Sequence, residues 1–150
     1  MFIQANDRTI NLKNVSNINI LHDRNRIVFN LNYNIEIFTN YGQSKYISDY
    51  VYWDCNNSQA LIANLEELNR SKYFIDNFIN QINDNGYINI NEISSIKYIE
   101  KKNRVIFNLS HPITFKDFDG KDKITSEFVY VNCDDNEQFI AYKQYLKSKL

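Results

Sequence analysis

The chain has 150 residues, of which 43% are hydrophobic and 15% aromatic, and this composition favours a folded core over disorder. Its formal net charge is −1, and its 17 basic and 18 acidic residues are scattered, so no acidic tail or basic arm indicates a partner. No apolar run approaches the ~18 residues of a membrane-spanning helix. The N-terminus MFIQANDR also lacks the basic start and apolar centre of a signal peptide. We therefore expect a soluble, intracellular protein.

The composition is biased toward residues with AT-rich codons. There are 24 Asn and 21 Ile, against 3 Gly and 1 Pro. Asn alternates with Ile, Phe and Tyr inside strand-like patterns, so the bias indicates genome composition and not a prion-like tract. An AT-rich bacterium or one of its phages would account for it.

Residues 6–70 and 84–148 align without a gap at a constant offset of 78, with 19 of 65 positions identical. The segment IVFNL at 27–31 falls on VIFNL at 105–109, and YVYWDC at 50–55 falls on FVYVNC at 128–133. Chance gives only a few identities over such a length. The sequence therefore predicts a tandem duplication of one structural unit.

Each copy is predicted to begin with two short strands. The first spans 9–12 in one copy and 87–90 in the other, after a turn-prone stretch rich in Asn and Asp. The second spans 15–21 or 93–99, has apolar residues at alternate positions, and leads to a polar hairpin tip. A fifth short strand at 2–4 would precede the first copy.

The third strand, 26–38 or 104–116, alternates apolar and polar residues, so one of its faces is expected to be buried. The residues on the predicted buried face are Ile27, Phe29, Leu31, Tyr33, Ile35 and Ile37 in one copy and Val105, Phe107, Leu109, His111, Ile113 and Phe115 in the other. Pro112 falls on the polar face, where its missing backbone donor predicts an edge position or a bulge.

A turn at Gly42 or Gly120 is predicted to lead into a fourth strand, at 45–55 or 123–133. Polar N-cap residues follow each fourth strand, and a helix is expected at 58–69 in one copy and 136–148 in the other.

The predicted fold class is α+β: a tandem duplication in which each copy is a 4–5-stranded antiparallel sheet followed by one helix. The two copies, 1–70 and 83–150, are expected to pack as a pseudo-twofold pair in one compact domain. The connector 71–82 is expected to be structured, as a helix or as a strand, because it contains no Gly or Pro.

The sequence provides no recognisable catalytic site, metal site or cofactor site. His22 and His111 occupy non-equivalent positions and no Cys-x-x-Cys pair occurs, so no ligand cluster forms. Cys55 and Cys133 are equivalent and are expected to be buried, reduced thiols. Three glycines cannot make a phosphate-binding loop. We therefore expect a protein that is not an enzyme, holds no cofactor and acts on no small-molecule substrate.

Aromatic side chains supply the remaining candidate surface. In the fourth strand both faces are apolar or aromatic, so either the strand lies between two layers or one face is a binding platform. The candidate interface residues are Tyr33, Tyr46, Tyr50, Tyr52, Phe128 and Tyr130.

The duplicated strand-strand-strand-strand-helix unit resembles the PUR-repeat and Whirly-type single-strand nucleic-acid-binding proteins, over nearly the whole chain but without shared signature residues. The resemblance implies single-stranded DNA or RNA as a partner, with bases stacked on aromatic rings. The hairpin tips would then supply the phosphate contacts, at Arg24, Arg26, Lys101, Lys102 and Arg104. The balanced net charge weighs against this function, because nucleic-acid domains show a basic excess.

Segments such as RIVFNL and YVYWD also resemble short proteins of AT-rich bacteria and their phages. The competing function is a structural protein that docks into a larger assembly of protein subunits, most concretely an accessory protein of a bacteriophage capsid. Near-neutral charge, abundant Tyr and the absence of catalytic groups favour it. We expect assembly ahead of nucleic-acid binding, in the host cytoplasm or in a phage particle, without membrane contact.

Overall fold

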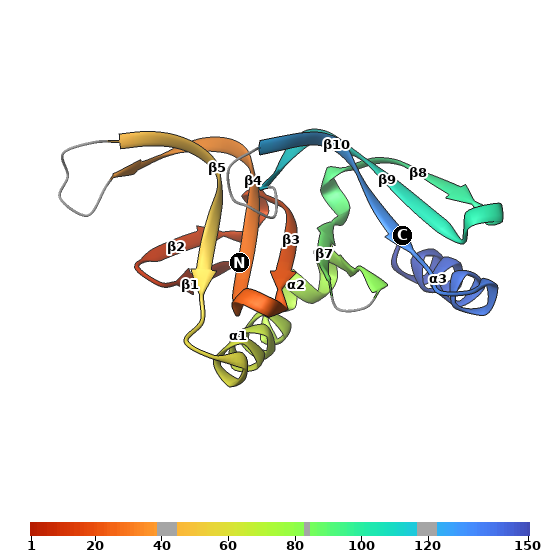
Figure 1. The fold of residues 1–150 in the computed structure, drawn as a ribbon, viewed down its shortest axis with the longest axis horizontal. Coiled ribbons are helices and arrows are strands. Elements are labelled where there is room, and N and C mark those ends of the chain that lie inside the picture. Colours follow the sequence, from red (N-terminus) through yellow and green to blue (C-terminus); the bar gives the residue numbers. More distant parts are fainter. Residues whose placement is uncertain (39–44, 83–84, 117–122) are drawn as a thin grey trace.

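A computed structural model describes residues 1–38, 45–82, 85–116 and 123–150; at 34–38, 45–48, 113–116 and 123–125 it describes the backbone alone. The chain is α+β, with antiparallel sheets and few helices. Figure 1 shows two halves side by side, each with a curved sheet above and helix below. The turns expected at Gly42 and Gly120 lie outside the described residues.

The first half contains β1 (Phe2–Ala5), β2 (Arg8–Asn11), β3 (Val15–Leu21), β4 (Arg26–Phe38), β5 (Lys45–Asp54) and α1 (Ser58–Arg70). The second half contains α2 (Lys72–Asn77), β6 (Phe78–Asn80), β7 (Gly86–Asn89), β8 (Ile93–Ile99), β9 (Arg104–Lys116), β10 (Lys123–Asn132) and α3 (Asn136–Lys149). Single 3-10 turns follow β2, β3, β7 and β8, at η1 (Leu12–Asn14), η2 (His22–Arg24), η4 (Ile90–Glu92) and η5 (Glu100–Lys102).

Corresponding elements of the two halves begin the same distance apart in the chain. β3 and β8 begin at residues 15 and 93, β4 and β9 at 26 and 104, and α1 and α3 at 58 and 136, a separation of 78 in each case. Both helices begin after an extended residue whose side chain accepts a backbone N–H, Asn57 from Ala60 and Asp135 from Gln138. The predicted strand and helix positions are therefore confirmed to within a few residues.

The sheet topology differs from the predicted pair of four-stranded sheets. One sheet has the order β5-β4-β3-β7-β6, a second the order β10-β9-β8, and β1 and β2 form a separate two-stranded sheet. The first predicted strand leaves its expected sheet because η1 turns the chain between β2 and β3. The predicted pseudo-twofold arrangement is wrong. A twofold axis that relates the halves would require β8 to pair with β2, as β3 pairs with β7. Instead β8 is the end strand of its sheet, and β2 pairs with β1 alone among the described strands.

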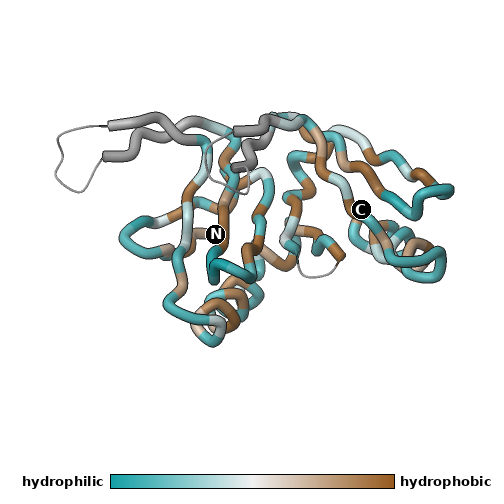
Figure 2. Tube along the Cα trace, viewed as in Figure 1, coloured by the Kyte–Doolittle hydropathy of each residue, from teal (hydrophilic) through white to brown (hydrophobic). Residues whose placement is uncertain are grey.

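The hairpin β6–β7 belongs to the cores of both halves. Phe78 packs in the first core, beneath β3, β4 and β5, together with Phe29 and Leu68. Ile79 and Ile88 pack in the second core, with Phe107 and Leu146 among others. Figure 2 shows hydrophobic positions alternating with polar ones along the strands of both halves. This hairpin therefore joins the two halves through strand pairing and through burial of apolar surface.

The connector was predicted to be either a helix or a strand, and it contains one of each, the short helix α2 and the strand β6. Phe29 and Phe107 are fully buried, as predicted, and Leu31 and Leu109 are also buried. Ile35 and Ile113 lie outside the residues whose side chains are described. Tyr33 was expected on the buried face but is 46% exposed.

The pairing of β4 with β5 skips residues 31–34, and that of β9 with β10 skips 109–112. This break in register ends the simple alternation and explains the exposed Tyr33. It also accommodates Pro112, which needs no ladder partner there, so the predicted bulge is confirmed.

Candidate interaction surface

The outer face of the second sheet, on the side away from α3, is the main candidate surface. Strand register aligns Lys97, Ile106 and Tyr130 in one row across β8, β9 and β10. The neighbouring rows are Ser95, Asn108 and Phe128 on one side and Ile99, Arg104 and Asn132 on the other. None of these nine side chains is buried. We call this set of residues the open face.

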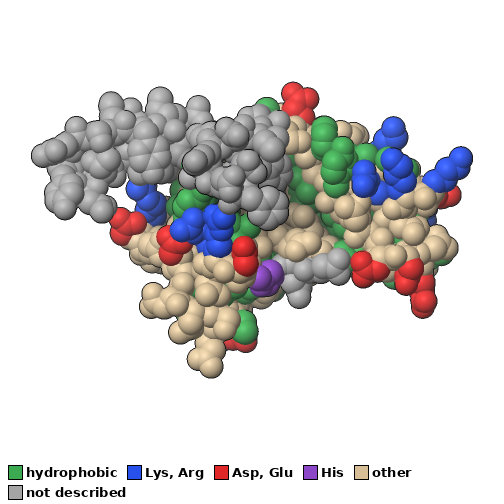
Figure 3. Space-filling model, in the orientation of Figure 1, with side chains coloured by type: hydrophobic (Ala, Val, Ile, Leu, Met, Phe, Trp, Pro, Cys, Tyr) green, Lys and Arg blue, Asp and Glu red, His purple; other side chains and the backbone are tan. Residues whose placement is uncertain are grey.

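Two aromatic rings and one guanidinium group form a stack on the open face. Phe128 is 38% exposed and Tyr130 46% exposed, and their ring centroids lie 4.8 Å apart. The guanidinium carbon of Arg104 lies 4.8 Å from the Tyr130 ring centroid, and Arg104 Nε donates to Asn132 Oδ1 at 2.6 Å. Figure 3 shows hydrophobic and basic side chains next to one another over the upper part of this half.

The first sheet has an equivalent stack, but most of its outer face is covered. Arg26 lies 4.2 Å above the Tyr52 ring, Tyr50 and Tyr52 are 5.1 Å apart, and Arg26 Nε is paired with the Asp54 carboxylate. Tyr50 is only 8% exposed, and Val28 is also buried. Strand β9 of the second half contacts β3, β4 and β5.

The fourth strand differs in burial between the two sheets. In the first sheet its inner residues Val51 and Trp53 enter the core and Tyr50 is also buried. In the second sheet Val129 and Val131 enter the core, while Phe128 and Tyr130 remain exposed.

The charge of the two stacks differs. Arg26 is compensated by Asp54, whereas the equivalent Arg104 is held by the neutral Asn132. The open face carries a second cation, Lys97, and no carboxylate among its nine residues. Of the two outer faces, the second sheet's thus presents exposed aromatic rings beside cations that no carboxylate of that face compensates.

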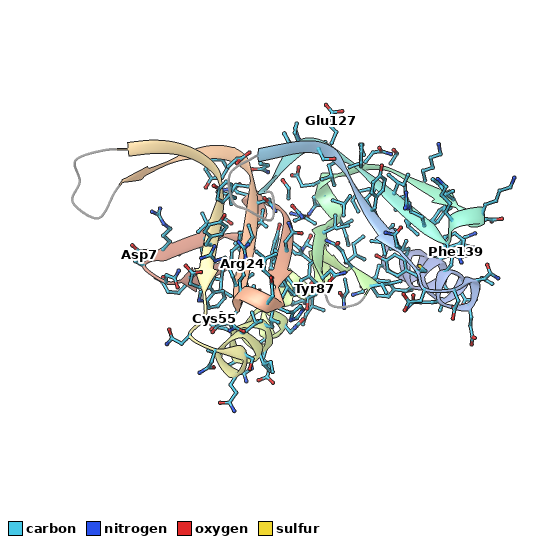
Figure 4. The ribbon with its side chains drawn as sticks, in the orientation of Figure 1. Asp7, Arg24, Cys55, Tyr87, Glu127 and Phe139 are labelled. Carbon is cyan, nitrogen blue, oxygen red and sulfur yellow. The ribbon has the colours of Figure 1, made fainter. Side chains whose placement is uncertain are left out.

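The remaining predicted site residues are not members of the open face. Arg24 belongs to η2, and Lys101 and Lys102 belong to η5, where all three are exposed at hairpin tips. Figure 4 shows Arg24 on the first half. Tyr33 is on β4, and the side chain of Tyr46 lies outside the described residues. Sequence reasoning missed Lys97 and Ile106, although their alternation with buried neighbours would have placed them opposite the core.

A buried carboxylate lies at the junction of the halves. Glu92 is 7% exposed; His111 Nδ1 lies 2.6 Å from its Oε2, and Asn32 Nδ2 donates to its Oε1 at 3.1 Å. The expectation of a core His111 is wrong, because its side chain is 52% exposed and forms this polar contact beyond the register break. Since all three polar groups find partners, the cluster stabilises the junction and leaves little capacity for a ligand.

Neither cysteine is activated for nucleophilic chemistry. Both are free thiols, and burial is the largest cause of the raised pKa of Cys133 and of Cys55. The charges of Asp134 and Asp135 raise the pKa of Cys133 further. A raised pKa lowers the thiolate fraction at neutral pH. Within residues 1–38, 45–82, 85–116 and 123–150, no three or more His, Cys, Asp or Glu residues gather at a potential metal site.

No known protein family, curated protein or solved structure matches this chain in comparisons. None of the helices in the described part of the chain is long and apolar enough to cross a membrane. The residues of the open face are therefore the main indication of function.

Proposed function

We propose that this chain is a non-enzymatic assembly protein that docks into a larger protein complex through the open face, most concretely as an accessory protein of a bacteriophage capsid. The observation that carries the proposal is the exposed stack of Phe128, Tyr130 and Arg104 on a rigid sheet. Aromatic and Arg side chains supply most of the energy at protein interfaces. Their position on neighbouring strands needs little ordering on binding, which favours affinity.

The proposal includes the tandem duplication. The constant separation of 78 between corresponding elements supports descent of both halves from one unit. On the outer face of the first sheet Val28 and Tyr50 are buried, whereas on the equivalent face of the second sheet Phe128 and Tyr130 are exposed. The AT-rich codon bias supports a phage or an AT-rich host as the source.

The test uses particles produced in a host that carries the gene, with an epitope-tagged full-length chain. We expect the wild-type chain in purified particles, and we expect the double variant Phe128→Ser/Tyr130→Ser to be depleted at least about tenfold. Tyr33→Ser is the matched control, because Tyr33 and Tyr130 are both 46% exposed and only Tyr130 lies on the open face. Equal incorporation of all three chains would contradict docking through this face.

Single-stranded nucleic acid is the second candidate partner. Lys97 and Arg104 lie beside the two exposed rings without a carboxylate, which suits a backbone phosphate next to stacked bases. Gel shifts with short single-stranded DNA at two salt concentrations distinguish the candidates. A tight, strongly salt-dependent complex that Phe128→Ser/Tyr130→Ser abolishes would reverse our ranking.

A further inference from the structure

Strand β8 presents an unpaired edge in the described part of the chain. It is the end strand of the sheet β10-β9-β8 and pairs on one side with β9. Its counterpart β3 pairs on both sides, with β4 and with β7. The difference is visible in burial: Ser16 and Asn17 of β3 are fully buried, whereas Ser94 and Ser95 of β8 are exposed.

The first half shows which backbone groups this edge presents. β7 pairs with β3 over Asn17, Ile18 and Asn19, and the positions 78 residues later are 95–97. Ile18 turns its carbonyl toward Gly86 of β7, and Ile20 N donates to the Asn85 carbonyl at 3.0 Å. Because backbone groups alternate along a strand, Ile96 and Tyr98 direct their N–H and C=O groups to the open edge.

We propose that a second copy of this chain pairs at this edge, β8 antiparallel to β8, about a twofold axis at Ile96. The sequence of β8, ISSIKYI, has Ile at both ends and at its centre, so the strand is close to self-complementary under such an axis. Ile96 then faces its own symmetry mate, and Ser95 faces Lys97 of the second copy on the open-face side. No like charges are directly opposite one another in this register.

A head-to-tail occupant fits less well. In that arrangement the hairpin β1–β2 of another copy would take the place that β6–β7 takes on β3. Arg8 stands where β7 has Gly86, at the same separation of 78. A Cβ at Gly86 would lie 1.9 Å from the Ile18 carbonyl oxygen, so the close approach needs glycine. Arg8 would also face Lys97, a pairing of like charges that destabilises a sheet.

The twofold pairing has two physical consequences. It joins two three-stranded sheets into one continuous sheet and ends there, because each copy has already used its β8 edge. It also removes an exposed strand edge that, apart from Lys97, lacks the charges and prolines that prevent edge pairing. Both open faces then lie on the same side of the joined sheet. The inference does not depend on the proposed function.

The test is sedimentation equilibrium of the full chain over a wide concentration range, with far-UV circular dichroism as the check on folding. We expect a reversible monomer–dimer equilibrium for the wild type. Ser95→Lys places two Lys pairs across the axis and is expected to raise Kd roughly three- to tenfold, whereas Ser95→Glu is expected to lower Kd. Ser95→Lys/Lys97→Glu restores opposite charges in both pairs and should return Kd toward the wild-type value.

Ser110→Lys is the matched control, since Ser110 is exposed on β9 and lies outside β8. Its Kd should equal that of the wild type. A wild-type chain that stays monomeric at the highest concentration, or a Ser95→Lys effect that Lys97→Glu does not reverse, would overturn the proposal. Assembly that grows beyond dimers and is changed by Arg8→Glu would support the head-to-tail contact instead and overturn the twofold pairing.

Discussion

Gly86 lies directly against the backbone of Ile18, so closely that a Cβ at Gly86 would stand 1.9 Å from the Ile18 carbonyl oxygen. Its φ of +149° is also a conformation that other residues rarely adopt. Figure 4 shows the neighbouring Tyr87 between the two halves. This single contact sets the distance at which β7 pairs with β3, and therefore how the halves are joined.

Gly86→Ala is predicted to destabilise the whole chain. Backbone strain at such a φ costs about 1–3 kcal/mol, and the added methyl group must also displace the β3 backbone. We expect a loss of roughly 3 kcal/mol in the free energy of unfolding, measured by urea titration. Asn85→Ala is the control, because the Asn85 contact with Ile20 uses the backbone carbonyl, which the variant keeps. Equal stability of the two variants would show that the β3–β7 approach is not restrictive.

Phe29 and Phe107 are predicted to contribute equally to their separate cores. Both side chains are fully buried and lie on corresponding strands, Phe29 in the first core and Phe107 in the second. Truncation of either to Ala should cost about 3–5 kcal/mol, as for other buried aromatic residues. Thermal unfolding followed by circular dichroism and by Trp53 fluorescence provides the measurement. If Phe107→Ala shifts the circular dichroism transition but leaves the Trp53 signal unchanged, the halves unfold independently and the joining role of β6–β7 is contradicted.

Tyr142 makes the stability depend on pH above the neutral range. Its hydroxyl donates to the Asn80 carbonyl at 2.9 Å, and burial raises its pKa far above the usual value of 10.0, with further contributions from Tyr145, Cys133 and Tyr98. Above pH 10 the unfolded chain releases this proton while the folded chain keeps it. The contribution of Tyr142 to the free energy of unfolding is therefore fully present below the pKa of Tyr in the unfolded chain. Above that pH the free energy of unfolding falls by about 1.4 kcal/mol per pH unit.

Tyr142→Phe is predicted to separate this effect from packing. The variant should lose about 1 kcal/mol at neutral pH through its missing hydrogen bond and show a shallower decline above pH 10. Urea titrations at several pH values provide the measurement. Tyr130→Phe, which removes a hydroxyl from an exposed ring, is the control and should keep the wild-type slope. An unchanged slope in Tyr142→Phe would refute the assignment.

Periodicity and turn chemistry were sufficient to predict the strands and helices. The alternation around Phe29 gave the buried face of β4, and Asn and Asp caps gave the starts of α1 and α3. The same reasoning could not predict that β7 pairs with β3. A strand pattern specifies which face is buried but not which strand pairs at each edge, and the close contact of Gly86 with Ile18 is visible only in the structure.

The candidate surface could be predicted only in part for the same reason. Both fourth strands carry aromatic residues at equivalent positions, and the sequence does not show that Tyr50 is buried while Tyr130 remains exposed. His111 was misplaced because the register break after Leu109 reverses the alternation that predicted a core position. Contacts between residues far apart in the sequence cannot be predicted from the local alternation of apolar and polar residues.

The final prediction distinguishes an assembly protein from a nucleic-acid binder by charge. If the chain binds single strands, each neutralised phosphate contact should lower the slope of log affinity against log salt by about 0.7. Arg26 should contribute less than Arg104, because Asp54 already compensates it. The informative variants are therefore Lys101→Gln, Lys102→Gln and Arg104→Gln, with Arg26→Gln as the control.

For an assembly protein, reversal of Lys101 and Lys102 to Glu should leave incorporation into particles within about twofold of wild type, because exposed rim charges contribute little binding energy. Phe128→Ser/Tyr130→Ser should instead remove most of it, since two rings that lose contact with water on docking carry the interface energy. We expect this second pattern. Loss of incorporation in the Lys101→Glu/Lys102→Glu chain together with full retention in the aromatic variant would place the contact at the hairpin tip and exclude the open face.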